Sequence, residues 1–105
     1  MKVQINTDSH VQHDESLTRH VESSVAGSLD RFGDQITRIE VHVRDKNGGK
    51  SGGNDKVCLM EARLEGRPPM TASEDADTVA SAVSGAARKL QRVLDHALGK
   101  LAHAH

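Results

Sequence analysis

A glycine-rich stretch in the middle of the chain contains residue types that bind phosphate in many proteins. It reads VRDKNGGKSGGNDKV over residues 43–57, with Lys50 and Ser51 directly after a glycine. A nucleotide-binding phosphate loop would need a further glycine at the position of Arg44, and a helix after the loop. The residues that follow are instead typical of a strand, so we predict a flexible connection between two strands. Its lysines, which would attract phosphate weakly, are Lys46, Lys50 and Lys56.

Histidine and cysteine are the other residue types here that could bind a metal or attack a substrate. His10 and His13 lie three residues apart, and His103 and His105 lie in the C-terminal tail, but neither pair has a cysteine or carboxylate at a zinc-ligand spacing. Cys58 lies in an apolar run and is expected to be a buried, unreactive thiol. No Ser/His/Asp arrangement is recognisable. We therefore expect no metal, no cofactor and no enzymatic activity.

A set of basic residues near the C-terminus is the strongest candidate for a binding site. Successive members at i, i+4 spacing lie on one face of a helix. Such a face is either an ordinary solvated surface or a series of phosphate contacts to a nucleic acid. The set, called the basic ridge below, consists of Arg88, Lys89, Arg92, His96 and Lys100.

Composition limits the classes of protein that are compatible with this chain. It has 105 residues, 28% charged residues and a net charge of −1, which argues against a strongly basic nucleic-acid binder but allows a local basic face. One cysteine excludes an internal disulfide, and neither a signal peptide nor an apolar stretch of membrane-spanning length is recognisable. We expect a soluble cytoplasmic protein in which residues 1–105 form one domain.

The first half of the chain predicts a strand, a helix and a second strand. Alternating apolar residues at 2–7 indicate the strand, and Asp14 is a suitable N-cap for a helix that runs to Phe32 and ends at Gly33 as its C′ residue. Residues 36–44, ITRIEVHVR, alternate in the manner of a half-buried strand. Their expected inward side chains are Ile39, Val41 and Val43.

Two more strands and a second helix are expected in the remaining sequence. Residues 56–66 predict a strand with Cys58, Met60, Ala62 and Leu64 inward. Residues 69–73, PMTAS, predict a short edge strand that begins at the second of two consecutive prolines. A long apolar stripe then predicts a helix capped by Ser73 or Asp75. The stripe consists of Val79, Ala82, Val83, Ala86, Leu90, Val93, Leu94, Ala97 and Leu101.

The order of these elements, β-α-β-β-β-α, predicts an α+β fold. The strand–helix–strand start implies a parallel crossover, and the next connections imply antiparallel hairpins. One four-stranded mixed sheet with both helices packed on one face would bury both apolar stripes.

Two segments of the sequence, DQITRIEVHVR at 34–44 and ASAVSGAARKLQRVL at 80–94, resemble the family of ribosome hibernation-promoting factors and ribosome-associated inhibitors, also called sigma-54 modulation proteins. The resemblance implies a cytosolic protein that binds rRNA of the small ribosomal subunit and inhibits translation, or promotes hibernation, under stress. Lys89 and Arg92 match basic positions of the family, and His96 stands where a lysine is usual. The resemblance thus implies rRNA binding by the basic ridge.

The sequence also departs from this family, which leaves a second hypothesis open. Ser24 and Gly27 stand where the family carries lysines, and Ala80 and Ser84 replace a typical tyrosine and aspartate. The alternative is a divergent interaction domain of the same fold that binds a protein partner or self-associates and does not bind rRNA. Arg19 and Arg31 are the residues that would have to rebuild a basic face on the first helix.

Overall fold

A four-stranded sheet with two helices forms the structure, a computed structural model that describes residues 1–47 and 55–99. A 3₁₀ turn, Asp30–Phe32, follows the first helix, and a π-helical turn, Asp95–Gly99, follows the second. The elements occur in the predicted β-α-β-β-β-α order. Their bounds are β1 Lys2–Thr7, α1 Glu15–Leu29, β2 Ile36–Asp45, β3 Lys56–Leu64, β4 Met70–Ala76 and α2 Val79–Leu94.

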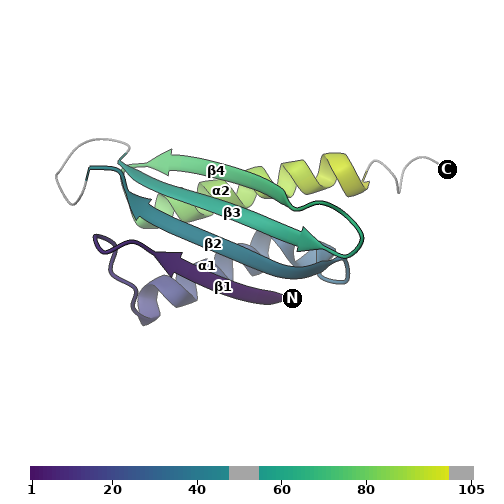
Figure 1. Ribbon diagram of the computed structural model, residues 1–105, viewed down its shortest axis with the longest axis horizontal. Coiled ribbons are helices and arrows are strands. Elements are labelled where there is room, and N and C mark those ends of the chain that lie inside the picture. The colour runs from purple at the N-terminus through teal and green to yellow at the C-terminus, as the bar shows by residue number, and fades with distance from the viewer. Residues whose placement is uncertain (48–54, 100–105) are drawn as a thin grey trace.

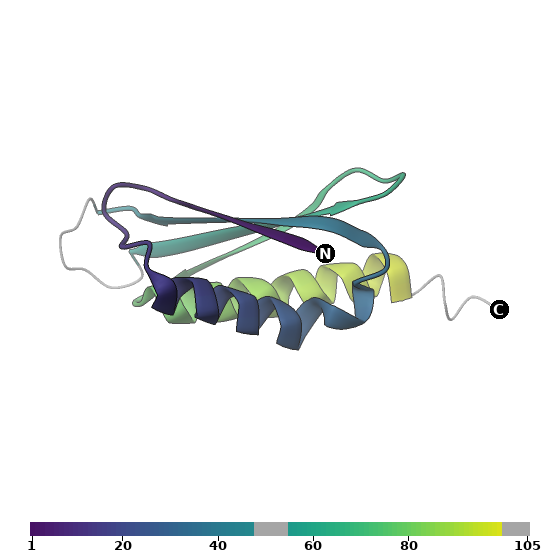
Figure 2. The same cartoon turned by 90° about the horizontal axis from the view of Figure 1, so that it is seen from below.

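The strands lie in the sheet in the order in which they occur along the chain (Figure 1). β1 pairs with β2 in parallel, whereas β2–β3 and β3–β4 are antiparallel. A parallel pair needs a crossover, which α1 supplies. Figure 2 shows both helices on the same face of the sheet, which leaves the other face uncovered. The predicted mixed sheet and its two-layer arrangement are confirmed.

The core lies between the sheet and the helices. The predicted inward side chains of β2 and β3 are all buried, because alternate residues of a strand point to the same face. The predicted stripe of α1 is buried too, at Leu17, Val21, Val25 and Leu29. Asp14 caps α1 as predicted, since its carboxylate accepts a hydrogen bond of 2.9 Å from the Leu17 amide.

The end of α1 differs from the prediction. The α-helix ends at Leu29, and the tighter 3₁₀ turn that follows buries Phe32. Gly33 has a φ of −52°, in the right-handed region, so it is not the left-handed C′ glycine that was expected. The chain leaves the helix through the 3₁₀ turn, which requires no positive φ at this position.

The start of α2 was also predicted wrongly. β4 extends to Ala76, so Ser73 and Asp75 lie within the strand and cannot cap the helix. Thr78 is the cap, and its hydroxyl accepts a hydrogen bond of 3.1 Å from the Ser81 amide.

One member of the predicted stripe of α2 lies outside the core. The Val93 side chain is 37% exposed, whereas Leu90 and Leu94 are fully buried and Leu98 is nearly so. Leu101 lies outside the described residues. Within the parts that the structure describes, neither helix is long and apolar enough to cross a membrane.

We expect Leu90→Ala to lower the free energy of unfolding by about 2–5 kcal/mol, because it leaves a cavity in the centre of the helix–sheet interface. Val93→Ala is the matched control on the same helix. It should change the free energy of unfolding by less than about 1 kcal/mol, since the Val93 side chain is partly solvated. Urea denaturation of both variants measures the difference. Equal losses would contradict the helix orientation described above.

Candidate nucleic-acid interface

The basic ridge lies on the solvent-facing side of α2 and its π-helical extension. Arg88, Lys89, Arg92 and His96 are all exposed, as a binding surface requires. The fifth member, Lys100, lies outside the described residues. The wider π-helical turn begins at Asp95, so the regular i, i+4 spacing holds from Arg88 to Arg92 but not onward to His96.

Lys89 is held by β4. Its Nζ lies 2.6 Å from Glu74 Oε1 and donates a hydrogen bond of 3.3 Å to the Ser73 carbonyl. Gly85 makes this arrangement possible, because a Cβ at that position would lie 2.5 Å from Glu74 Oε2. The Glu74 carboxylate thus lies over the helix backbone and neutralises one cation of the ridge.

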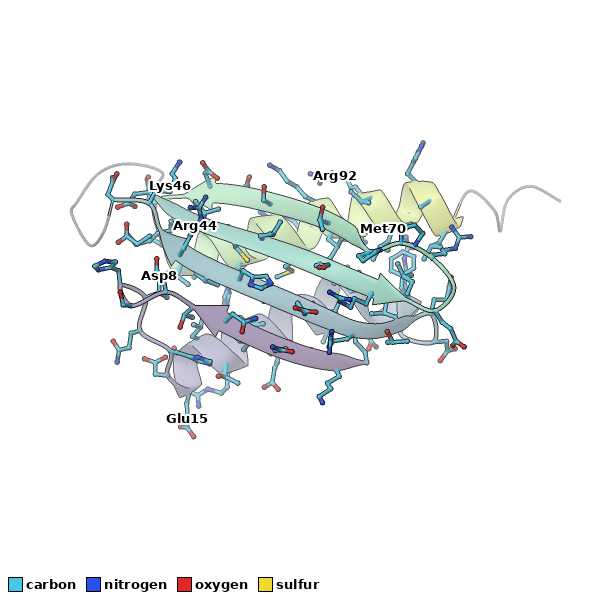
Figure 3. The ribbon with its side chains drawn as sticks, viewed as in Figure 1. Asp8, Glu15, Arg44, Lys46, Met70 and Arg92 are labelled. Atoms are coloured by element: carbon cyan, nitrogen blue, oxygen red, sulfur yellow. The ribbon has the colours of Figure 1, made fainter. Side chains whose placement is uncertain are left out.

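Arg88 and Arg92 are the available cations of the ridge. Within residues 1–47 and 55–99, neither guanidinium takes part in an ion pair or a side-chain hydrogen bond. Figure 3 shows Arg92 beyond the β4 edge of the sheet, at the Met70 end. A planar guanidinium can donate two parallel hydrogen bonds to one phosphate, so these two residues are suited to contact a nucleic-acid backbone.

α1 does not rebuild a basic face. Arg31, in the turn after α1, pairs with Asp95, and its Cζ lies 4.7 Å from the centre of the Phe32 ring. Arg19 Nη1 lies 3.5 Å from Glu15 Oε2. His20 bridges the two helices, because its Nε2 lies 2.9 Å from the Ala80 carbonyl oxygen. Of the two helices, α2 therefore carries the basic residues that have no ion pair within the described residues.

The lysines at the loop end of the β2–β3 hairpin are paired with carboxylates. Lys46 Nζ lies 2.7 Å from Asp75, and its hydrogen bond lowers the pKa of that carboxyl. Lys56 Nζ lies 3.0 Å from Oδ1 of the buried Asp55. This hydrogen bond is the main reason why the pKa of Lys56 is raised. The expected attraction of these two lysines for phosphate is not supported, since each has an internal anionic partner. Lys50 lies outside the described residues.

A groove that the sequence did not reveal lies beside the ridge. It has a volume of about 700 Å³ and runs between the β4 residues 70–73 and the helix residues 89–97. Val93, Met70, Ala72 and Ala97 supply its apolar surface. The apolar periodicity of the helix assigned Val93 to the core and so concealed the groove.

The other candidate residues that the structure describes form no site, and His103 and His105 lie outside the described residues. Cys58 is fully buried between sheet and helices, and burial raises the pKa of its thiol to about 12. Among the residues that the structure describes, no three His, Cys, Asp or Glu side chains are grouped so that they could hold a metal ion.

Comparisons with known proteins agree on the fold. A family model described as sigma 54 modulation protein / S30EA ribosomal protein matches residues 3–102. A ribosomal subunit interface protein from Coxiella burnetii aligns with a TM-score of 0.79 and 17% identity, over 94% of this chain and 99% of that one. The N-terminal domain of Thermus thermophilus Protein Y aligns with a TM-score of 0.73 and 17% identity, over 91% and 98%. A comparison with curated proteins finds no match.

We expect Cys58 in the folded protein not to react with Ellman's reagent at pH 8, because a buried thiol with this raised pKa has almost no thiolate. Full reaction should appear on addition of denaturant. Absorbance of the released thionitrobenzoate measures both states. Rapid reaction of the native protein would show that the thiol is accessible.

Proposed function

The chain belongs to the sigma 54 modulation protein / S30EA ribosomal protein family, and from this premise we propose that it binds rRNA of the small ribosomal subunit and inhibits translation, or promotes hibernation, under stress. The family is one of ribosome-associated proteins and not a family of enzymes. The proposal includes a cytoplasmic location, the absence of catalysis, and one ribosome-binding domain over residues 1–105.

The observation that carries this proposal is that the arginines of the ridge are exposed and have no ion pair within residues 1–47 and 55–99. Phosphate contacts supply most of the affinity that is independent of sequence, and each contact releases condensed counterions. Arg88 and Arg92 are adjacent on one face of α2, so they can contact neighbouring phosphates. His96 adds a positive charge only when it is protonated, and Lys100 is the remaining proposed contact.

The charge balance of the chain sets a limit on this binding. With a net charge of −1, the protein as a whole does not attract RNA, so association depends on the local ridge. Few phosphate contacts give a modest affinity that falls as salt rises.

A divergent interaction domain is the second candidate function. The pairing of Lys89, Arg31 and Lys46 with carboxylates reduces the cationic surface, and Ser24 and Gly27 supply no charge. Such a protein would bind a protein partner or a second copy and would not sediment with ribosomes.

We expect the double variant Arg88→Ala/Arg92→Ala to weaken association with small subunits and to lower the slope of log K against log salt by about 1.5, because two phosphate contacts are lost. Folding should be unaffected, since both side chains are exposed. Sedimentation with purified subunits across a salt series measures both quantities.

A matched control removes the same charge elsewhere. Arg44→Ala/Arg67→Ala changes two exposed arginines that have no ion pair within the described residues and lie off the ridge. This variant should keep the wild-type slope. Equal effects of the two doubles would mean that net charge, and not the ridge, governs binding; a wild-type protein that never sediments would favour the interaction domain.

We also expect Glu74→Gln to strengthen binding and steepen the salt dependence by about 0.8, because Lys89 is released to contact phosphate. Lys89→Ala alone should have little effect, whereas adding it to Glu74→Gln should return the slope to the wild-type value. This double-mutant cycle separates release of Lys89 from simple removal of a negative charge. Additive effects would show that Lys89 does not respond to Glu74.

A further inference from the structure

We propose that the groove between β4 and α2 binds an extended peptide with alternating apolar and acidic side chains, which adds to the sheet as a fifth strand beside β4. This inference goes beyond ribosome binding and does not require it. It rests on three properties of the groove: a strand edge that pairs with no further strand, an apolar floor, and the Arg92 guanidinium at its rim.

The free edge is formed by the backbone of β4. This strand pairs with β3 on one side only and ends the sheet. Residues of a strand point their N–H and C=O groups alternately to its two sides. The Ser73 carbonyl is reached by Lys89 from the helix side, so it points away from β3. Thr71, two residues earlier, therefore also presents its N–H and C=O to the free edge.

The floor of the groove can accept apolar side chains. Val93 is one of three large hydrophobic side chains that are exposed within the described residues. Met70, Ala72 and Ala97 are partly buried beside it, and the volume of about 700 Å³ has room for several small side chains. A strand added to β4 would direct alternate side chains toward this floor, as in other complexes where a peptide lies between an edge strand and a helix.

The charges around the groove select the partner. Arg92 and His96 lie along it, and Lys89 at its other end neutralises the nearby Glu74. Since Glu74 already pairs with Lys89, Arg92 is the cation that an acidic side chain of the peptide would complement. A single-stranded nucleic acid fits less well, because such strands stack their bases on aromatic side chains and the only aromatic residue of the chain, Phe32, is buried elsewhere.

The test uses a synthetic peptide, acetyl-Glu-Val-Glu-Val-Glu-Val-amide, titrated into the ¹⁵N-labelled protein. We expect saturable NMR shifts centred on the amides of Thr71 and Ser73, and no comparable shifts with the peptide in which lysine replaces glutamate. Thr71→Pro should abolish binding, because it removes an edge N–H that the β3–β4 ladder does not use. Val93→Asp should weaken binding about tenfold or more through repulsion and loss of the apolar floor.

A control variant, Leu59→Asp, changes an exposed apolar side chain on the open face of the sheet and should bind like wild type. Unchanged binding by Val93→Asp would overturn the proposal even if Thr71→Pro failed to fold. The proposal would also be overturned if the lysine peptide bound equally well or if no saturable shifts appeared. Stronger shifts of the same amides with hexauridylate would point to a nucleic acid instead. Shifts of β4 amides that depend on protein concentration alone would point to a second copy of the chain. Ribosome sedimentation by wild type bears only on the proposed function, so the two ideas fail separately.

Discussion

The close approach of the Glu74 side chain to α2 at Gly85 places its carboxylate beside Lys89 and so decides which cation of the ridge is paired. A glycine in a helix interior is unfavourable, but here the missing side chain lets the β4 carboxylate lie over the helix backbone. From that position the carboxylate pairs with Lys89, which in turn donates to the Ser73 carbonyl. The small residue at position 85 thereby allows Lys89 to be paired with β4.

The balance of charge over the rest of the surface follows a similar rule. Arg31 pairs with Asp95 between the turns that follow the two helices, Lys46 pairs with Asp75 of β4, and Arg63 pairs with Glu40 on the open face of the sheet. Exposed pairs of this kind contribute little to stability, but they remove positive charge from any long-range attraction of RNA. Arg88 and Arg92, like Arg44 and Arg67, have no ion pair within the described residues, but they alone of these four lie one helical turn apart on the same helix.

The sequence predicted the architecture well because strand alternation and helical periodicity report directly on burial. The inward residues of β2 and β3, the stripe of α1 and its Asp14 cap were all correct. The errors lie where tertiary contacts decide. β4 extends past Ser73 because it pairs with β3 up to Ala76. Val93 is partly exposed because it lines the open groove between β4 and α2. The exposure of the ridge was predictable, whereas the pairing of Lys89 with Glu74 required the three-dimensional register of β4 against α2.

The cluster of Asp45, Asp55 and Lys56 at the loop end of the β2–β3 hairpin has a consequence for protein engineering. Asp45 lies opposite Lys56 in the strand register, the Lys46 amide donates to the Asp55 carbonyl at 2.8 Å, and Lys56 holds both buried carboxylates. These contacts hold the two strand ends together, and loop-closure entropy rises only slowly with length. Figure 3 shows Lys46 and Arg92 toward opposite ends of the sheet. The junction between residues 47 and 55 is thus a suitable place to insert a fluorescent or affinity tag without disturbing the face that would contact a ribosome.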